Sequence, residues 1–183
     1  THCRAALGVE APLVTVETHL ASGLPAFNIV GLPETAVRES RDRVRSALPN
    51  SGFDFPPRRI TVNLAPADLP KQGSRFDLAI AIGILAAAKQ LPKNATDGYE
   101  LVGELSLAGA LRPVHALLPQ ALAARARAVK LILPSENLHE ASLRMAVNLA
   151  RSGQGASARD EYRELIAANA PSWVRTVAAQ ELA

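Results

Sequence analysis

The sequence predicts an α+β domain followed by a helical tail. Apolar residues make up 48% of the chain and aromatic residues only 4%, so the core is aliphatic, which suits helices packed on a sheet. Strand-like and helix-like patterns alternate up to residue 134, and only helical patterns follow. With 183 residues the chain is long enough for one or two domains, and we place them at residues 1–137 and 138–183.

Two strands, a helix and a third strand make up the first half of the predicted domain. A turn containing Gly23 and Pro25 joins the first two β-branched segments, so we expect these to pair as a hairpin. In the helix, Val37, Val44 and Leu48 share one face. The hairpin strands are expected at residues 13–20 and 26–30, the helix at 34–48 with Pro49 as its stop, and the third strand at 58–65.

The second half is centred on a helix that is apolar on every side, as is typical of a helix buried against a sheet. A second hairpin, an alanine-rich helix and a short strand that we expect to be buried complete the domain. The loop before the apolar helix is residues 66–74, that helix 76–89, the hairpin 99–107 with 111–114, the last helix 117–128 and the last strand 130–134.

The predicted tail contains three helices, at residues 139–151, 158–168 and 173–182. The first two are spaced like one tetratricopeptide-like unit, and the third would cap it. A plain helical extension that packs on the first domain explains the same pattern.

Cysteine and histidine usage excludes several classes of protein. Cys3 is the single cysteine, so there is no internal disulfide framework and no cysteine-based metal cluster, and we expect Cys3 to be an ordinary terminal thiol. The four histidines are scattered along the chain without paired spacing, so no metal site is predicted.

The lengths of the apolar runs and the nature of the first residues indicate where in the cell the protein is expected. The longest apolar run, residues 78–88, is too short to span a membrane. The first residues lack the features of a secretory signal, and Thr1 is not an initiator, so we interpret the sequence as part of a longer cytoplasmic chain.

Common catalytic and nucleotide-binding motifs are absent from the sequence. There is no phosphate-binding GxxxxGK motif followed by Ser or Thr, no GxGxxG after a strand, no GxSxG and no HExxH. We therefore expect no catalytic residue, no cofactor and no metal in this chain.

Basic residues are concentrated in the first domain, with 15 Lys and Arg against 11 Asp and Glu up to residue 134, and 5 against 6 beyond it. Three arginines fall on one side of the 34–48 helix, and two more begin the next strand, so together they could contact nucleic-acid phosphates. These are Arg38, Arg41, Arg45, Arg58 and Arg59. Alternatively, Glu34, Glu39 and Asp42 neutralise part of a solvated face.

The loop before the apolar helix is a second candidate site. Lys71 and Arg75 could bind an anion at the start of that helix. Alternatively, they only fix the loop against the sheet. Asp77 is expected to cap the helix or to pair with Arg75.

Three long segments of the chain resemble the N-terminal domain of the ComM/YifB family of magnesium-chelatase-like AAA+ ATPases. They are GLPETAVRESRDRVRSA at residues 31–47, ITVNLAPADLPKQGSRFDLAIAIGIL at 60–85 and GELSLAGALRPV at 103–114. The resemblance covers about residues 8–137, and it implies the fold of the Lon proteolytic domain and of the second domain of ribosomal protein S5.

Comparison with the Lon motifs implies that peptidase activity is absent. Where Lon has its serine this sequence has Arg75, with Ser74 one position early, and where Lon has its lysine this sequence has Leu118. A Ser-Lys dyad needs a neutral lysine to accept the serine proton, and arginine stays protonated.

The family resemblance implies a non-catalytic accessory domain of an ATPase that acts on DNA in natural transformation and recombination. ATP and magnesium are expected only for an AAA+ module downstream, and that module and DNA are the implied partners. The family pattern stops after Glu136 and Asn137. An alternative is therefore a stand-alone module that binds a protein through residues 139–183. An enzyme that uses the loop around Lys71 and Asp77 is a third possibility.

Overall fold

The computed structural model describes residues 1–134 together with 156–157, 159–160 and 163. Contacts within the chain divide it into two units, Thr1–Pro134 and Ser135–Ala183. The tetratricopeptide-like pairing predicted for residues 139–183 lies outside the described residues. The first unit mixes helices and strands, so the predicted α+β class is confirmed.

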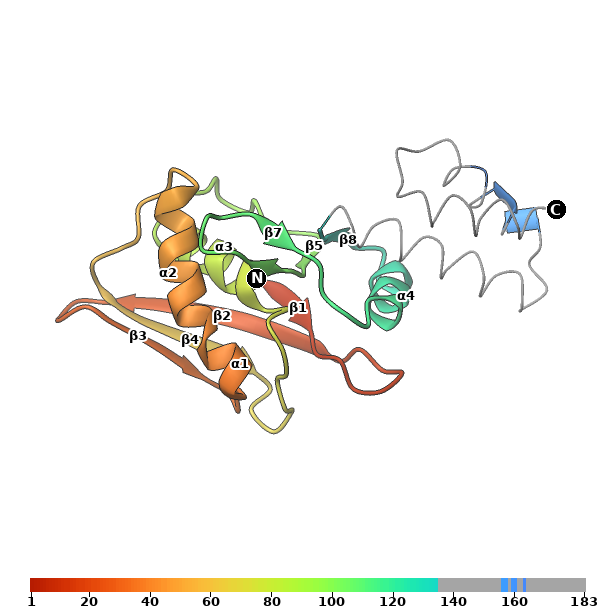
Figure 1. Cartoon of the computed structure of the whole chain (residues 1–183), viewed down its shortest axis with the longest axis horizontal. Helices are drawn as coiled ribbons and strands as arrows, with labels where there is room; N and C mark the ends of the chain where they lie inside the picture. Colours follow the sequence, from red (N-terminus) through yellow and green to blue (C-terminus); the bar gives the residue numbers. More distant parts are fainter. Residues whose placement is uncertain (135–155, 158, 161–162, 164–183) are drawn as a thin grey trace. The chain divides into compact units, whose positions relative to one another are not determined.

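A four-stranded sheet forms the base of the first unit (Figure 1), with the strand order β1-β2-β4-β3. The central pair, β2 and β4, is antiparallel, and β3 runs parallel to β4. The strands are β1 (His2–Arg4), β2 (Leu13–Ala21), β3 (Ala26–Val30) and β4 (Arg59–Ala65).

The predicted hairpin of residues 13–20 and 26–30 is wrong, because β4 lies between β2 and β3. Ile60, Val62 and Leu64 of β4 are all 0% exposed, whereas Phe27 is the one residue of β3 that is buried. The three fully buried side chains of β4 lie at the centre of the sheet, where a strand buries most surface, and β3 is left at the edge.

Three helices lie along the same side of this sheet (Figure 1). They are α1 (Thr35–Arg38), α2 (Ser40–Asn50) and α3 (Asp77–Ala87). The all-round apolar pattern of α3 correctly predicts a core helix, since Ala79, Ile80 and Ile84 are fully buried. The single helix predicted for residues 34–48 is instead divided at Glu39, and Pro49 lies inside the last turn of α2.

Two small sheets and a helix complete the first unit. β5 (Tyr99–Leu101) pairs in parallel with β8 (Lys130–Ile132), and β6 (Glu104–Leu105) pairs antiparallel with β7 (Leu111–Arg112). Helix α4 covers Leu118–Ala126. The second predicted hairpin is therefore confirmed only for β6 and β7. The strand near residue 130 is not buried as predicted, because β8 pairs along one edge only and Ile132 is 42% exposed.

The sequence did not predict β1, because a strand of three residues is too short to show a periodic pattern. Its presence corrects the interpretation of Cys3, which is 0% exposed and part of the core. No helix of the described residues is both long and apolar enough to cross a membrane.

Candidate nucleic-acid interface

All five arginines predicted to contact phosphates are exposed. Val37 of α1 and Val44 of α2 are buried, while the residues that follow them, Arg38 and Arg45, are exposed. Arg38 ends α1, Arg41 and Arg45 lie on α2, Arg58 precedes β4 and Arg59 begins it.

None of these five side chains forms an ion pair within the described residues. The i,i+4 spacing of Glu39 and Arg43 predicts an ion pair, and the structure confirms it at 3.5 Å. Arg38 donates from Nε to the Pro33 carbonyl at 3.2 Å, and Arg41 donates from Nε to the Arg38 carbonyl at 3.1 Å. The outward charges therefore lack carboxylate partners.

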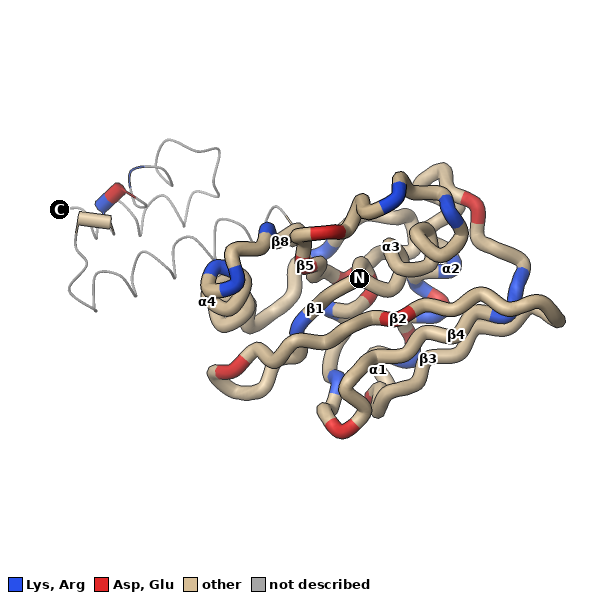
Figure 2. Tube along the Cα trace, turned by 180° about the vertical axis from the view of Figure 1, so that it is seen from behind, with Lys and Arg blue, Asp and Glu red and all other residues tan. Residues whose placement is uncertain are grey.

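An aromatic contact holds Arg45 beside the segment that connects α2 to β4. Its guanidinium carbon lies 5.4 Å from the centre of the Phe55 ring, in the range of a cation–π contact. Phe55 in turn packs on Phe27 with 6.0 Å between ring centres. Figure 2 shows Lys and Arg positions gathered at the end of the unit where β4 begins.

The structure places Lys71 and Arg75 inside the loop rather than on an open surface. Lys71 is 0% exposed and Arg75 is 5% exposed. The Lys71 ammonium donates to the Pro66 carbonyl. Arg75 donates to the His115 carbonyl and, at 3.4 Å, to Gln120 Oε1. Burial lowers the pKa of both side chains. This geometry fits the alternative in which the two residues fix the loop.

Asp77 neither caps α3 nor pairs with Arg75, contrary to both predictions. Its fully buried carboxylate accepts hydrogen bonds from the Ser40 hydroxyl, from Arg43 Nε at 2.6 Å and from the Leu105 N–H at 3.1 Å. The hydrogen bond that Arg43 donates to Asp77 raises the pKa of the Arg43 guanidinium. This network joins α2, α3 and β6. Sequence reasoning missed it because Arg43 and Asp77 are 34 residues apart.

The positions that correspond to the Lon dyad hold no proton acceptor of the required kind. The Ser74 hydroxyl donates to the Glu104 carboxylate, Arg75 is buried among carbonyls, and Leu118 begins α4. Within the part of the chain that the structure describes, no group of three or more His, Cys, Asp or Glu side chains could hold a metal ion.

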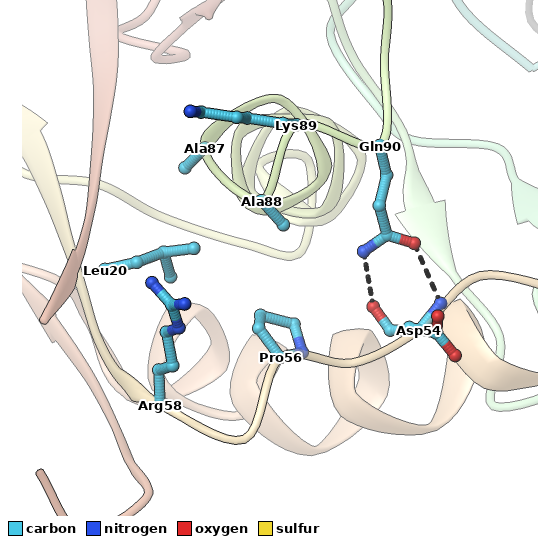
Figure 3. A pocket seen from close by; sticks show the side chains of 8 residues that line it. All are labelled: Leu20, Asp54, Pro56, Arg58, Ala87, Ala88, Lys89 and Gln90. Atoms are coloured by element: carbon cyan, nitrogen blue, oxygen red, sulfur yellow. Dashed lines mark hydrogen bonds between the residues drawn. The ribbon is translucent and has the colours of Figure 1, made fainter. Parts of the chain in front are cut away.

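Lys89 is a basic residue that sequence reasoning missed. It follows α3 and is among the residues that line the same hollow as Arg58, and Figure 3 shows its side chain crossing the end of the helix on the side away from Asp54. A single lysine after a helix carries no pattern that would single it out.

Comparison with known proteins identifies relatives of residues 16–137, which match the family model described as subunit ChlI of Mg-chelatase. The chain is 57% identical over 142 residues to competence protein ComM of Haemophilus influenzae and 56% identical to YifB of Escherichia coli. Each match covers 78% of this chain and 28% of the relative. The chain is also 30% identical over 139 residues to Lon protease 2 of Bacillus subtilis, covering 68% of this chain and 25% of that protein. It thus spans under a third of the length of these relatives.

Proposed function

This chain belongs to the family described as subunit ChlI of Mg-chelatase and matches the N-terminal region of ComM and YifB, and on that premise we propose that it is a DNA-contacting accessory domain of a ComM-like ATPase. The five exposed arginines without carboxylate partners carry the proposal. They would contact the sugar-phosphate backbone, so binding would be independent of sequence.

The spacing of the arginines on α2 supports this role. Arg41 and Arg45 are one helical turn apart, about 6 Å along the helix axis. One strand of duplex DNA carries a phosphate about every 3.4 Å along its axis, so these two side chains would lie about two phosphates apart. Arg58 and Arg59 would extend the contact toward the start of β4.

The accessory role includes no chemistry of its own. We propose that the first unit shares the fold of the Lon proteolytic domain, in line with the 30% identity to Lon protease 2, but that it is not a peptidase. The Ser74 hydroxyl donates a hydrogen bond to the Glu104 carboxylate, whereas a Ser-Lys dyad needs a neutral lysine beside the serine. ATP and magnesium would be bound by an AAA+ module of the parent protein, which would act in the cytoplasm during natural transformation and recombination.

Fluorescence anisotropy with a branched DNA tests the proposal. Replacing Arg38, Arg41 and Arg45 together with alanine should weaken binding, and should reduce the slope of log K against log salt by about 0.9 for each lost phosphate contact. Arg112→Ala is the matched control, because this exposed arginine already pairs with Glu104 at 3.5 Å. Equal affinities and slopes for the triple variant and the original protein, with both folded by circular dichroism, would refute a DNA role for this surface.

A further inference from the structure

A hollow of about 390 Å³ lies between the end of β2, the end of α3 and the segment before β4. Its walls combine an apolar side with two basic side chains (Figure 3). The lining residues are Leu20, Asp54, Pro56, Arg58, Ala87, Ala88, Lys89 and Gln90. The volume falls within the range of about 300 to 1,000 Å³ that small-molecule sites occupy.

We propose that this hollow binds the phosphate monoester of a nucleotide, with Arg58 and Lys89 as the phosphate contacts. The inference deepens the proposed DNA role and rests on it, since a nucleotide end is the part of a DNA strand that carries such a group. The apolar wall made by Leu20, Pro56 and the alanines at the end of α3 would receive the sugar or base.

The charges at the hollow favour an anion. Neither Arg58 nor Lys89 forms an ion pair within the described residues. Asp54 is the acid of the lining, and Figure 3 shows its carboxylate on the opposite side of the hollow from both cations. A phosphate monoester carries close to two negative charges at neutral pH, which matches the two cations.

The wall of the hollow is held in place by a reciprocal pair of hydrogen bonds. The Asp54 N–H donates to Gln90 Oε1 at 2.9 Å, and Gln90 Nε2 donates to the Asp54 carbonyl at 2.7 Å. These two bonds fasten the segment before β4 to the end of α3. Because the walls are already ordered, a ligand loses less free energy in ordering them.

Lys89 adopts a backbone conformation that favours glycine. Its φ is 59°, and it ends α3 in a Schellman motif, in which the Gln90 N–H donates to the Leu85 carbonyl at 2.9 Å and the Lys89 N–H donates to the Ala86 carbonyl at 3.0 Å. Glycine adopts this position without strain.

The end of α3 also favours cations at the hollow. The carbonyl end of a helix carries partial negative charge that attracts cations. The Schellman hydrogen bonds occupy the Leu85 and Ala86 carbonyls. The ammonium and guanidinium groups therefore keep most of their capacity for a phosphate.

The Schellman motif allows a variant that removes charge without destabilising the fold. Lys89→Gly removes the ammonium and relieves the backbone, so the variant should melt at the same temperature as the original protein or higher. Lys93→Gln is the matched control, because Lys93 is exposed and lies outside this lining. Arg58→Gln provides a second, independent loss of charge.

The binding probes are thymidine 5′-monophosphate, measured by calorimetry, and short oligonucleotides with a 5′-phosphate or a 5′-hydroxyl, measured by anisotropy. We expect Lys89→Gly and Arg58→Gln to weaken binding of the phosphate-bearing probes about tenfold or more and Lys93→Gln to change it little. If the protein prefers the 5′-phosphorylated oligonucleotide and does not bind the mononucleotide, the ligand is a DNA end. If the mononucleotide binds about as tightly as the phosphorylated oligonucleotide, the ligand is a free nucleotide.

The proposal is overturned if the 5′-phosphate adds no affinity and the mononucleotide does not bind, or if Lys89→Gly binds both as tightly as the original protein. None of Arg38, Arg41 and Arg45 lines this hollow, so the effect of their triple variant on branched DNA tests the proposed function separately.

Discussion

The arginines inside the first unit and those on its surface differ in their partners. Arg4 is buried, and its Nε donates to Glu100 Oε2 at 2.7 Å, while Arg43 donates to the buried Asp77. Arg38 and Arg41, which are exposed, contact only backbone carbonyls. A buried guanidinium needs a carboxylate to offset its desolvation, whereas an exposed one keeps its charge available to a ligand. Position and partner therefore separate the arginines that hold the fold together from those that we propose to contact DNA.

The largest expected effect comes from removing the buried carboxylate of Asp77. Asp77→Ala leaves Arg43 with only the exposed Glu39 as a carboxylate partner, and it takes away the acceptor for Ser40 and Leu105. We expect a loss of about 3 to 5 kcal/mol in the free energy of unfolding, measured by urea denaturation. Asp42→Ala, an exposed acid of the same helix α2, should change it by less than about 0.5 kcal/mol. Similar small losses for both variants would contradict the distinction.

A smaller test uses pH to probe the same interior. Burial raises the pKa of the Cys3 thiol from 9.0 to about 12. Above pH 9 the unfolded chain loses this proton and the folded chain keeps it, so stability falls with rising pH by about 1.4 kcal/mol per unit. Denaturation at pH 8 to 10.5 should show this slope, and Cys3→Ala should reduce it. A slope that is unaffected by the substitution would show that the thiol is accessible in the folded protein.

The smallest expected effect concerns the outer arginines themselves. Arg38→Ala and Arg41→Ala should each change the free energy of unfolding by less than about 0.5 kcal/mol, because their side chains hold no buried group in place. Arg45→Ala should cost more, about 0.5 to 1 kcal/mol, since it loses the contact with Phe55. Thermal unfolding of the three variants gives the order. If Arg38→Ala or Arg41→Ala lowered the free energy of unfolding as much as Asp77→Ala, these exposed arginines would be structural.

Local patterns predicted the parts of the fold that depend on local chemistry. The apolar surface of α3 and the inward faces of α1 and α2 are visible in residue spacing, because burial repeats with the helical turn. The outward position of Arg45, next to the buried Val44, follows from the same spacing, whereas the exposure of Arg41, three residues before Val44, does not.

Pairings across long stretches of chain could not be predicted in this way. The place of β4 between β2 and β3 depends on the competition among strands for the centre of the sheet. The pairing of Arg43 with Asp77 and the burial of Lys71 depend on where the loop before α3 folds back. The hollow next to Lys89 exists because residue 54 and residue 90 meet through two hydrogen bonds, and no motif records that meeting.

The place of β4 in the sheet also governs how the protein is made. β1, β2 and β3 leave the ribosome before β4, and β3 has no neighbour in the finished sheet except β4. Such non-local pairing is slow and leaves strand edges exposed. A nascent chain that ends before Arg59 therefore cannot contain the native sheet, and it is the stage of synthesis at which a chaperone would protect the chain most.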